Sequence, residues 1–335
     1  MRAAIIDRPG EIRVGDVPDP KPRDGQVVVA VGACGICGTD LHIADGHFPP
    51  TPYPIVPGHE LAGEIVELGA DVPAGWRVGD RVAVDPSLFC GYCAPCRAGH
   101  GNLCDNWGAT GDTVDGGFAE YVAVPAANCY QMPEGMTWQQ GALVEPVSCA
   151  VHGVRRVGVE AGEHFLVVGA GTMGLIMQQL LQRAGAEVSV VDHNTARLGR
   201  ARDLGARAVS SDTSEFDGVR FDAAADCTGA VPAIEAAFDS LRRGGRLLVF
   251  GVAPEQARVA LSPFRIYNDE ITVVGSMAVL HSYGPALELV ASGAVDTATL
   301  LTDTLGLERF PEALERMRAG NGLKVQVVPG DSDAS

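Results

Sequence analysis

The hexapeptide GAGTMG at positions 169–174 follows the pattern G-x-G-x-x-G, and its setting constrains the fold more than any other feature. An apolar run at 165–168 precedes it, and residues 175–183 continue it with a helical pattern. The first glycine then permits a tight turn, the second lets backbone approach a pyrophosphate, and the third lets the helix pack closely on the strand. The helix N-terminus adds N–H groups and a positive dipole. This setting predicts a dinucleotide-binding turn.

Asp192 ends the next apolar run, 18 residues after Gly174, where an acid bonds ribose hydroxyls and repels a 2′-phosphate. His193 follows it, and Arg197 is near enough to keep NADP open as the less favoured alternative to NAD. The other interpretation is an ordinary strand–turn–helix corner in which Asp192 caps a helix. The residues expected to bind the cofactor are Gly169, Gly171, Thr172, Met173, Gly174, Asp192, His193 and Arg197.

Strand-like and helix-like segments alternate from about residue 146 onward, which is typical of a parallel sheet covered on both faces. Residues 1–145 instead contain short strand-like runs punctuated by glycine, proline and aspartate, as in a small barrel or sandwich. Near the C-terminus we expect helices at 284–292 and 307–319 and a final strand at 324–328. The chain is therefore an α/β protein with a second, β-rich part.

Charge and hydropathy exclude two classes of partner. The net charge is 25 − 42 = −17, so no basic face is available for nucleic acid. Lys21 and Lys324 are the only lysines, which we interpret as a compositional bias rather than chemistry. No apolar run approaches the roughly 18 residues that cross a membrane, and the N-terminus lacks a signal-peptide core. We expect a cytoplasmic protein whose thiols stay reduced.

Four cysteines lie at 90–104 with the spacing C-x2-C-x2-C-x7-C, and we refer to this segment as the cysteine lobe. Four thiolates in a loop of this kind suit one closed, tetrahedral zinc site. An iron–sulfur cluster and disulfides are the alternatives, the second disfavoured by the expected compartment. The expected structural zinc ligands are Cys90, Cys93, Cys96 and Cys104.

A second group combines Cys37 with His59 and Glu60. One thiolate, one imidazole and one carboxylate leave a coordination position for a substrate, which is the pattern of a catalytic zinc. Cys34 and Cys37 also form a C-x-x-C pair, but their neighbours argue against a redox role. A lone histidine or cysteine is otherwise more often a packing residue.

The segment 58–66, GHELAGEIV, resembles the zinc signature of the zinc-dependent medium-chain dehydrogenase/reductase family. The cysteine lobe and the glycine turn stand in that family's order. The resemblance covers essentially the whole chain. It implies a GroES-like catalytic domain formed by 1–146 with 285–335, and a Rossmann NAD-binding domain at 147–284.

Carried over by position, the resemblance makes Cys37 and His59 ligands of a catalytic zinc. Glu60 takes the place of a ligand or exchanging carboxylate, and Glu145 replaces the third-ligand cysteine of simple alcohol dehydrogenases. An acid there is similar to the polyol and threonine-type branches, and 135–153 is closer to the polyol branch. The relay positions are matched by Thr39 and His42, whereas four cysteines match no ligand position and are taken as packing residues: Cys34, Cys129, Cys149 and Cys227.

The resemblance implies a dehydrogenase with one catalytic and one structural zinc that oxidises a secondary hydroxyl of a polyol to a ketone with NAD. Threonine-type or amino-alcohol substrates and sugar or cyclitol phosphates remain open, the last because an arginine at 155, 156 or 265 could meet a phosphate. A zinc hydrolase would not need the glycine turn, and a non-catalytic dinucleotide-binding protein would be free to lose the zinc ligands.

The substrate pocket and the assembly are less constrained. His47, Phe48 and Trp107 are candidate pocket walls, with loop packing as the alternative. The resemblance implies a homodimer or homotetramer, and 271–278 is a candidate edge strand for pairing between subunits.

Overall fold

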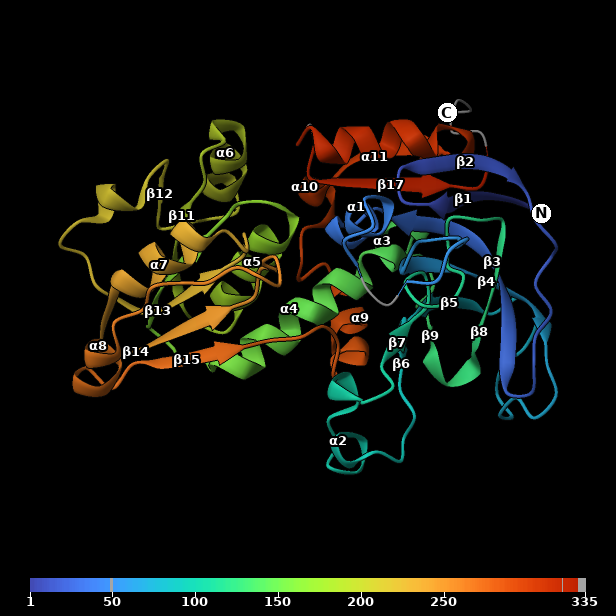
Figure 1. Ribbon diagram of the computed structural model, residues 1–335, viewed down its shortest axis with the longest axis horizontal. Helices are drawn as coiled ribbons and strands as arrows, with labels where there is room; N and C mark the ends of the chain where they lie inside the picture. Colours follow the sequence, from blue (N-terminus) through green and yellow to red (C-terminus); the bar gives the residue numbers. More distant parts are fainter. Residues whose placement is uncertain (49–50, 321, 331–335) are drawn as a thin grey trace. The chain divides into compact units, whose positions relative to one another are not determined.

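The computed structural model describes residues 1–48, 51–320 and 322–330, and it divides into two compact units (Figure 1). The first unit comprises Met1–Ser148 with Val279–Ser335, and the second comprises Cys149–Ala278. The expected domain boundaries after residues 146 and 284 lie two and six residues from these divisions. The first unit therefore takes both ends of the chain, and the second is inserted between them.

The second unit is built on a six-stranded sheet in which every neighbouring pair is parallel. The strand order is that of a doubly wound Rossmann fold, and it reverses between the first and fourth strands, where ligands bind in such sheets. Long apolar runs form these strands because both faces are buried, as at Leu166 and Leu247. In spatial order the strands are β12 (Ala208–Ser210), β11 (Glu187–Val191), β10 (His164–Val168), β13 (Phe221–Asp226), β14 (Leu241–Val249) and β15 (Thr272–Gly275).

Helices in this unit follow the strands. Helix α5 (Thr172–Arg183) packs on β10 and β11, and α7 (Val231–Asp239) packs on β13 and β14. Helix α4 (Val144–Val157) contains the chain division at Ser148. The other helices are α6 (Thr195–Asp203), η3 (Thr213–Phe216) and α8 (Pro263–Asn268). The expected parallel α/β architecture is confirmed.

The first unit centres on a mostly antiparallel sheet that joins the two chain ends. The C-terminal strand β17 (Lys324–Val328) has the expected bounds and pairs with β3 (Gln26–Gly35), so that Val327 lies opposite Cys34. The sheet order is β16 (Leu301–Gly306), β17, β3, β4 (Glu60–Leu68), β5 (Arg81–Val84) and β9 (Cys129–Gln131), and β8 (Tyr121–Pro125) also pairs with β3. Two small sheets pair β1 (Arg2–Arg8) with β2 (Glu11–Asp16), and β6 (Ser87–Leu88) with β7 (Gly108–Ala109).

Short helices lie between the strands of this unit along the chain. The helix expected at 284–292 is α9 (Tyr283–Ala291). The segment expected at 307–319 divides into η4 (Leu307–Arg309) and α11 (Phe310–Arg318), because Pro311 has no N–H to continue a helix begun earlier. The remaining helices are α1 (Gly38–Ala44), α2 (Ala94–Arg97), η1 (Gly101–Leu103), η2 (Ala126–Asn128), α3 (Trp138–Ala142) and α10 (Thr297–Leu300). Among the described residues, no helix combines the length and the apolar character that crossing a bilayer requires.

Candidate functional site

Cys37 occupies the junction between strand β3 and helix α1. The Asp40 carboxylate, one turn into the helix, accepts a hydrogen bond of 2.8 Å from the Cys37 backbone N–H and so fixes the helix start. Thr39 lies two residues after Cys37, and its Oγ1 is 3.8 Å from the Cys37 Sγ. The thiol is therefore held on a rigid helix end beside a hydroxyl group.

His59 is set by close packing of glycine backbones from a distant loop. Gly58 has φ +105°, which favours glycine, and a methyl group on Gly111 or Gly116 would overlap the Gly58 backbone. The Gly117 N–H donates to the Gly58 carbonyl over 2.8 Å. This packing brings the loop that carries Asp112 to the imidazole of His59.

The ligand atoms of Cys37, His59 and Glu60 lie within 4.8 Å of one another, and the last two residues are buried. His59 directly precedes β4, Glu60 is the first residue of that strand, and Glu60 lies opposite Gly35 at the end of β3. A thiol, an imidazole and a carboxylate together are a donor set that zinc accepts. The structure therefore brings together three residues that the sequence marked as metal ligands.

Carboxylates surround the His59 imidazole. Its Nδ1 lies 3.1 Å from Asp112 Oδ1 and 3.9 Å from Asp40 Oδ1, and all three atoms are buried without a well-formed hydrogen bond. Burial lowers the pKa of His59, but the charges of Asp112 and Asp40 outweigh it and raise the pKa well above its ordinary value. Burial raises the pKa of Asp40 to about 7. Acids behind a histidine in this way orient its other nitrogen toward a metal, so the arrangement fits one.

The sequence did not point to Lys324, whose ammonium balances the negative charge of Glu60. The ammonium of Lys324 is buried and contacts both carboxylate oxygens of Glu60, at 2.7 and 2.6 Å. Burial lowers the pKa of Lys324, yet the charges of Glu60 and Cys37 raise it above its ordinary value. The interpretation of this lysine as compositional bias is therefore incomplete. Lys324 is one of only two lysines in the sequence, and that rarity does not show which acid it meets.

The other expected residues near this group have different positions. Glu145 is buried in the first turn of α4, but it is not a member of the group within 4.8 Å among the described residues, so its assignment as a ligand stays a prediction. His42 is exposed on α1. Phe48 packs against the cluster of Ile6, Ile43 and Ile55, which supports a packing role.

The cysteine lobe is preorganised as a metal centre. All four sulfur atoms lie within 4.8 Å of one another, and the cysteines are free thiols. Backbone N–H groups of Cys90 and Asn106 each donate to Cys104 Sγ at 3.3 Å. Such N–H···S contacts stabilise thiolates, the form that binds zinc. The structure therefore brings together the four cysteines that the spacing predicted: Cys90, Cys93, Cys96 and Cys104.

The glycine turn lies at the carboxyl end of β10, with Gly169 at φ +99° and α5 beginning at Thr172. Thr172 Oγ1 is buried without a hydrogen-bond partner among the described residues. Asp192 Oδ2 accepts from the Ala170 N–H at 2.7 Å, and Arg197 Nη1 lies 3.9 Å from that same oxygen. Met173 is half-buried and His193 is exposed. Free N–H groups at a helix start beside an acid fit a dinucleotide.

Among the arginines considered for a phosphate, Arg265 is already engaged. Its guanidinium bonds the Asp239 side chain, the Leu241 carbonyl and the Asp269 carboxylate. Arg156 donates to the Gly275 carbonyl. These contacts tie α8 and β15 to the rest of the second unit and do not favour phosphate binding.

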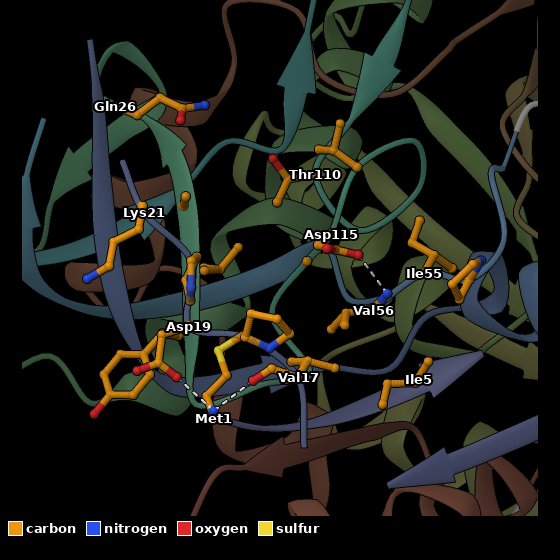
Figure 2. A pocket seen from close by; sticks show the side chains of 18 of the residues that line it. Met1, Ile5, Val17, Asp19, Lys21, Gln26, Ile55, Val56, Thr110 and Asp115 are labelled. Atoms are coloured by element: carbon orange, nitrogen blue, oxygen red, sulfur yellow. Dashed lines mark hydrogen bonds and ion pairs between the residues drawn. The ribbon is translucent and has the colours of Figure 1, made fainter. Parts of the chain in front are cut away.

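A pocket of about 710 Å³ opens elsewhere in the first unit (Figure 2). The Met1 ammonium there bonds Asp19 and the Val17 carbonyl, and Asp115 Oδ1 accepts from the Val56 N–H at 2.9 Å (Figure 2). None of the expected metal ligands lines it. Its polar groups make hydrogen bonds and an ion pair between neighbouring segments. Because no expected metal ligand lines it, this pocket is separate from the candidate metal site.

Comparisons with known proteins show that this chain is similar to zinc-binding dehydrogenases along nearly its whole length. The profile of the alcohol dehydrogenase GroES-like domain matches residues 23–134, and that of the zinc-binding dehydrogenase matches 172–292. D-arabinitol dehydrogenase 1 of Uromyces fabae is 35% identical over 98% of this chain and 97% of its own. D-altritol 5-dehydrogenase of Agrobacterium fabrum is 36% identical over 94% of each. A zinc-binding dehydrogenase of Sinorhizobium meliloti 1021, solved with NADP, superimposes with TM-score 0.93 and 34% identity over 98% of this chain and 99% of its own.

Proposed function

This chain belongs to the zinc-dependent medium-chain dehydrogenase/reductase family, and from that premise we propose that it oxidises a secondary hydroxyl of a polyol to a ketone, with NAD as hydride acceptor. The observation that carries the proposal is the close grouping of half-buried Cys37 with buried His59 and Glu60. Two relatives whose names specify D-arabinitol and D-altritol, similar along nearly the whole chain, support a polyol over a simple alcohol.

In this proposal each chain holds two zinc ions. Cys37 and His59, with Glu60 or Glu145, hold the catalytic ion, and the cysteine lobe holds the structural ion. The catalytic ion supplies a Lewis acid, which makes the proton of an alcohol easier to remove. The four thiolates of the cysteine lobe leave no coordination position open, so that site serves stability.

Side chains of the protein then accept the alcohol proton and release it to solvent. Thr39 Oγ1, next to Cys37 Sγ, accepts the substrate hydroxyl proton while its own hydroxyl proton passes on toward His42, so the threonine ends neutral. His42 lies three residues further along α1, on the same helix face, and its exposure lets it exchange that proton with solvent. Asp40 does not take part in this relay, because its carboxylate is fully buried and faces the Cys37 N–H and the His59 Nδ1.

The second unit provides the cofactor site in this proposal. Thr172 and Met173 begin the helix whose N–H groups face the pyrophosphate, and Gly171 allows its approach. Asp192 favours NAD because its carboxylate meets the ribose hydroxyls and repels a 2′-phosphate. Arg197 lies beside Asp192, and the S. meliloti relative was solved with NADP bound. The preference for NAD over NADP is therefore measured in the test below.

We also propose that two copies pair through β15, giving a dimer, or a tetramer made of two such dimers. Strand β15 is the edge of the parallel sheet, so its outer backbone groups lack a partner strand among the described residues. Large apolar side chains are exposed along it and on the neighbouring α8, with Val273 42%, Phe264 69% and Tyr267 83% exposed. A twofold axis at this edge would continue the sheet and cover them.

The test mixes the protein with NAD or NADP and a panel of polyols, sugar phosphates, threonine and simple alcohols, and follows absorbance at the NADH band. Each reaction is run with and without a zinc chelator. The proposal expects a chelator-sensitive signal with polyols and NAD. A signal confined to threonine or to a sugar phosphate would transfer the assignment to that substrate class, and no signal from zinc-loaded protein would contradict catalysis.

A further inference from the structure

The pocket of about 710 Å³ in the first unit has an apolar interior (Figure 2). Buried aliphatic side chains line it, among them Ile5, Ile55 and Val122. Its volume is within the range of about 300–1,000 Å³ that small-molecule sites occupy. Four prolines stiffen its walls, because their rings fix φ. They are Pro18, Pro20, Pro54 and Pro125. The pocket is therefore preformed and large enough for a small organic molecule.

One wall of this pocket is the loop that also carries Asp112 to His59. Asp115 and Gly116 line the pocket from this loop, whereas Asp112 Oδ1 lies 3.1 Å from His59 Nδ1. The Val56 N–H donates to Asp115 Oδ1 at 2.9 Å, and the Val56 carbonyl accepts from the Gly116 N–H at 2.7 Å. These two hydrogen bonds hold the wall in a fixed conformation, so a ligand binds here with little reorganisation of the backbone.

Thr110, near the start of the same loop, brings an unused hydroxyl group to the pocket. The residue is 1% exposed, and among the residues that the structure describes its Oγ1 makes no hydrogen bond. A buried hydroxyl group without a partner costs free energy, which a polar atom of a ligand recovers by bonding to it. The interior therefore combines an apolar surface with one polar anchor, as small-molecule sites do.

The rim of the pocket is positive, although the net charge of the chain is −17. The charged residues that line the pocket are Met1 with its ammonium, Arg13, Asp19, Lys21, Arg23 and Asp115. Asp19 is already paired with the Met1 ammonium at 2.7 Å. Lys21 is 78% exposed and lies 3.6 Å from Glu67, and within the described part of the chain the Arg23 guanidinium has no ion-pair partner. The rim therefore favours an anion.

We propose that this pocket is a second ligand site, which binds an organic anion with an apolar body. The apolar part lies against the aliphatic interior, within the pocket that Thr110 lines, and the anionic group faces Lys21 and Arg23 at the rim. The ligand also contacts the loop that carries Asp112. None of the expected metal ligands lines this pocket, so binding here does not depend on the proposed dehydrogenase activity.

Octanoate is the probe for this site, and octanamide is its uncharged counterpart of the same length. Calorimetric titration of the zinc-loaded protein should show saturable octanoate binding, with octanamide weaker by about tenfold or more. Arg23→Glu reverses a charge at the rim and should weaken octanoate binding by about tenfold or more. Arg77→Glu makes the same change at an exposed residue outside the pocket and should bind octanoate like the parent protein.

Filling the pocket provides a second test. Val114 lines the pocket and is 45% exposed, so a larger side chain there occupies the pocket without disturbing the core. Val114→Trp should abolish saturable octanoate binding. Val78→Trp, at a residue that is 61% exposed and does not line the pocket, is the matched control and should bind octanoate normally. Thermal unfolding of both variants shows that they are folded.

Three results would overturn the inference. Equal affinities for octanoate and octanamide would mean that the rim selects no anion. Parent-like octanoate binding in both Arg23→Glu and Val114→Trp would place the carboxylate elsewhere, for example at the candidate metal site. No saturable binding to the parent protein would also contradict a ligand site, and sedimentation velocity of the parent and Val114→Trp would then show whether a second copy of the chain covers the pocket.

Discussion

Asp192 reaches back across the glycine turn, where its Oδ2 accepts a hydrogen bond of 2.7 Å from the Ala170 N–H. Its Oδ1 accepts from the Asn194 N–H, also at 2.7 Å. The carboxylate is thus fixed beside the turn, at the end of β11, by two backbone donors. Each oxygen keeps a lone pair free, so the same carboxylate is able to accept ribose hydroxyls without moving.

Replacing Asp192 with serine should shift cofactor preference toward NADP. The substitution removes the negative charge that opposes a 2′-phosphate while Arg197 remains, and we expect the ratio of kcat/KM for NAD over NADP to fall by about tenfold or more. Asp203→Ser, at the far end of α6, removes the same charge away from the turn and serves as the control. An unchanged ratio in Asp192→Ser would remove this residue from the ribose site.

Two glycines of the turn should separate folding from cofactor binding. A methyl group on Gly171 meets no atom within 4 Å, so Gly171→Ala should retain stability but weaken NAD binding by about tenfold or more, because the methyl stands where the pyrophosphate approaches. A methyl group on Gly174 would overlap the Gly169 carbonyl, so Gly174→Ala should destabilise the fold by about 1–3 kcal/mol. Thermal unfolding and NAD titration of both variants test this, and normal NAD affinity in Gly171→Ala would count against the assignment.

Cys93→Ser should lower the zinc content by one ion per chain and destabilise the protein. The sulfur atoms of the cysteine lobe already lie close together, for example 3.5 Å between Cys90 and Cys104, so metal binding there contributes directly to folding. We expect the loss of several kcal/mol of unfolding free energy. Cys149→Ser, outside both metal groups, should keep the zinc content. Full zinc content in Cys93→Ser would contradict a four-thiolate site.

The sequence was most informative where one short segment carries the chemistry. Zinc-binding spacing in the cysteine lobe and the G-x-G-x-x-G turn after an apolar strand were both predictable, because their geometry is local. Strand β17 was also predicted with its observed bounds. The extra turn η4 ahead of α11 was not, since Pro311 decides only where an α-helix starts, not what precedes it.

Contacts between distant segments were not predictable in the same way. Lys324 and Glu60 are 264 positions apart, and only the pairing of β17 with β3 and of β3 with β4 brings them together. Asp112 reaches His59 because glycines at 58, 111 and 116 let two loops approach each other closely. A single sequence gives no signal for which acid or lysine will complete a site by this route.

Glu145→Ala should lower turnover while the fold is retained. Glu145 is buried at the start of α4, and its charge acts on Lys324, so it belongs to the electrostatic surroundings of the candidate metal site. We expect kcat/KM with a polyol to fall by at least about tenfold, the range over which acid–base and positioning groups act. Glu145→Gln, which keeps the shape without the charge, separates the two contributions. Unchanged turnover would remove Glu145 from the site.

Asp112→Asn should weaken zinc binding at the Cys37 site. The Asp112 carboxylate lies 3.1 Å from His59 Nδ1, so it orients the imidazole and strengthens its other nitrogen as a donor. Removing the charge should lower zinc affinity by about 10- to 100-fold, measured by chelator competition. Asp115→Asn is the matched control on the same loop, because an amide oxygen still accepts the hydrogen bond from the Val56 N–H. Equal affinity in Asp112→Asn and the parent would mean that the site orients His59 without this acid, and that Asp40 is sufficient.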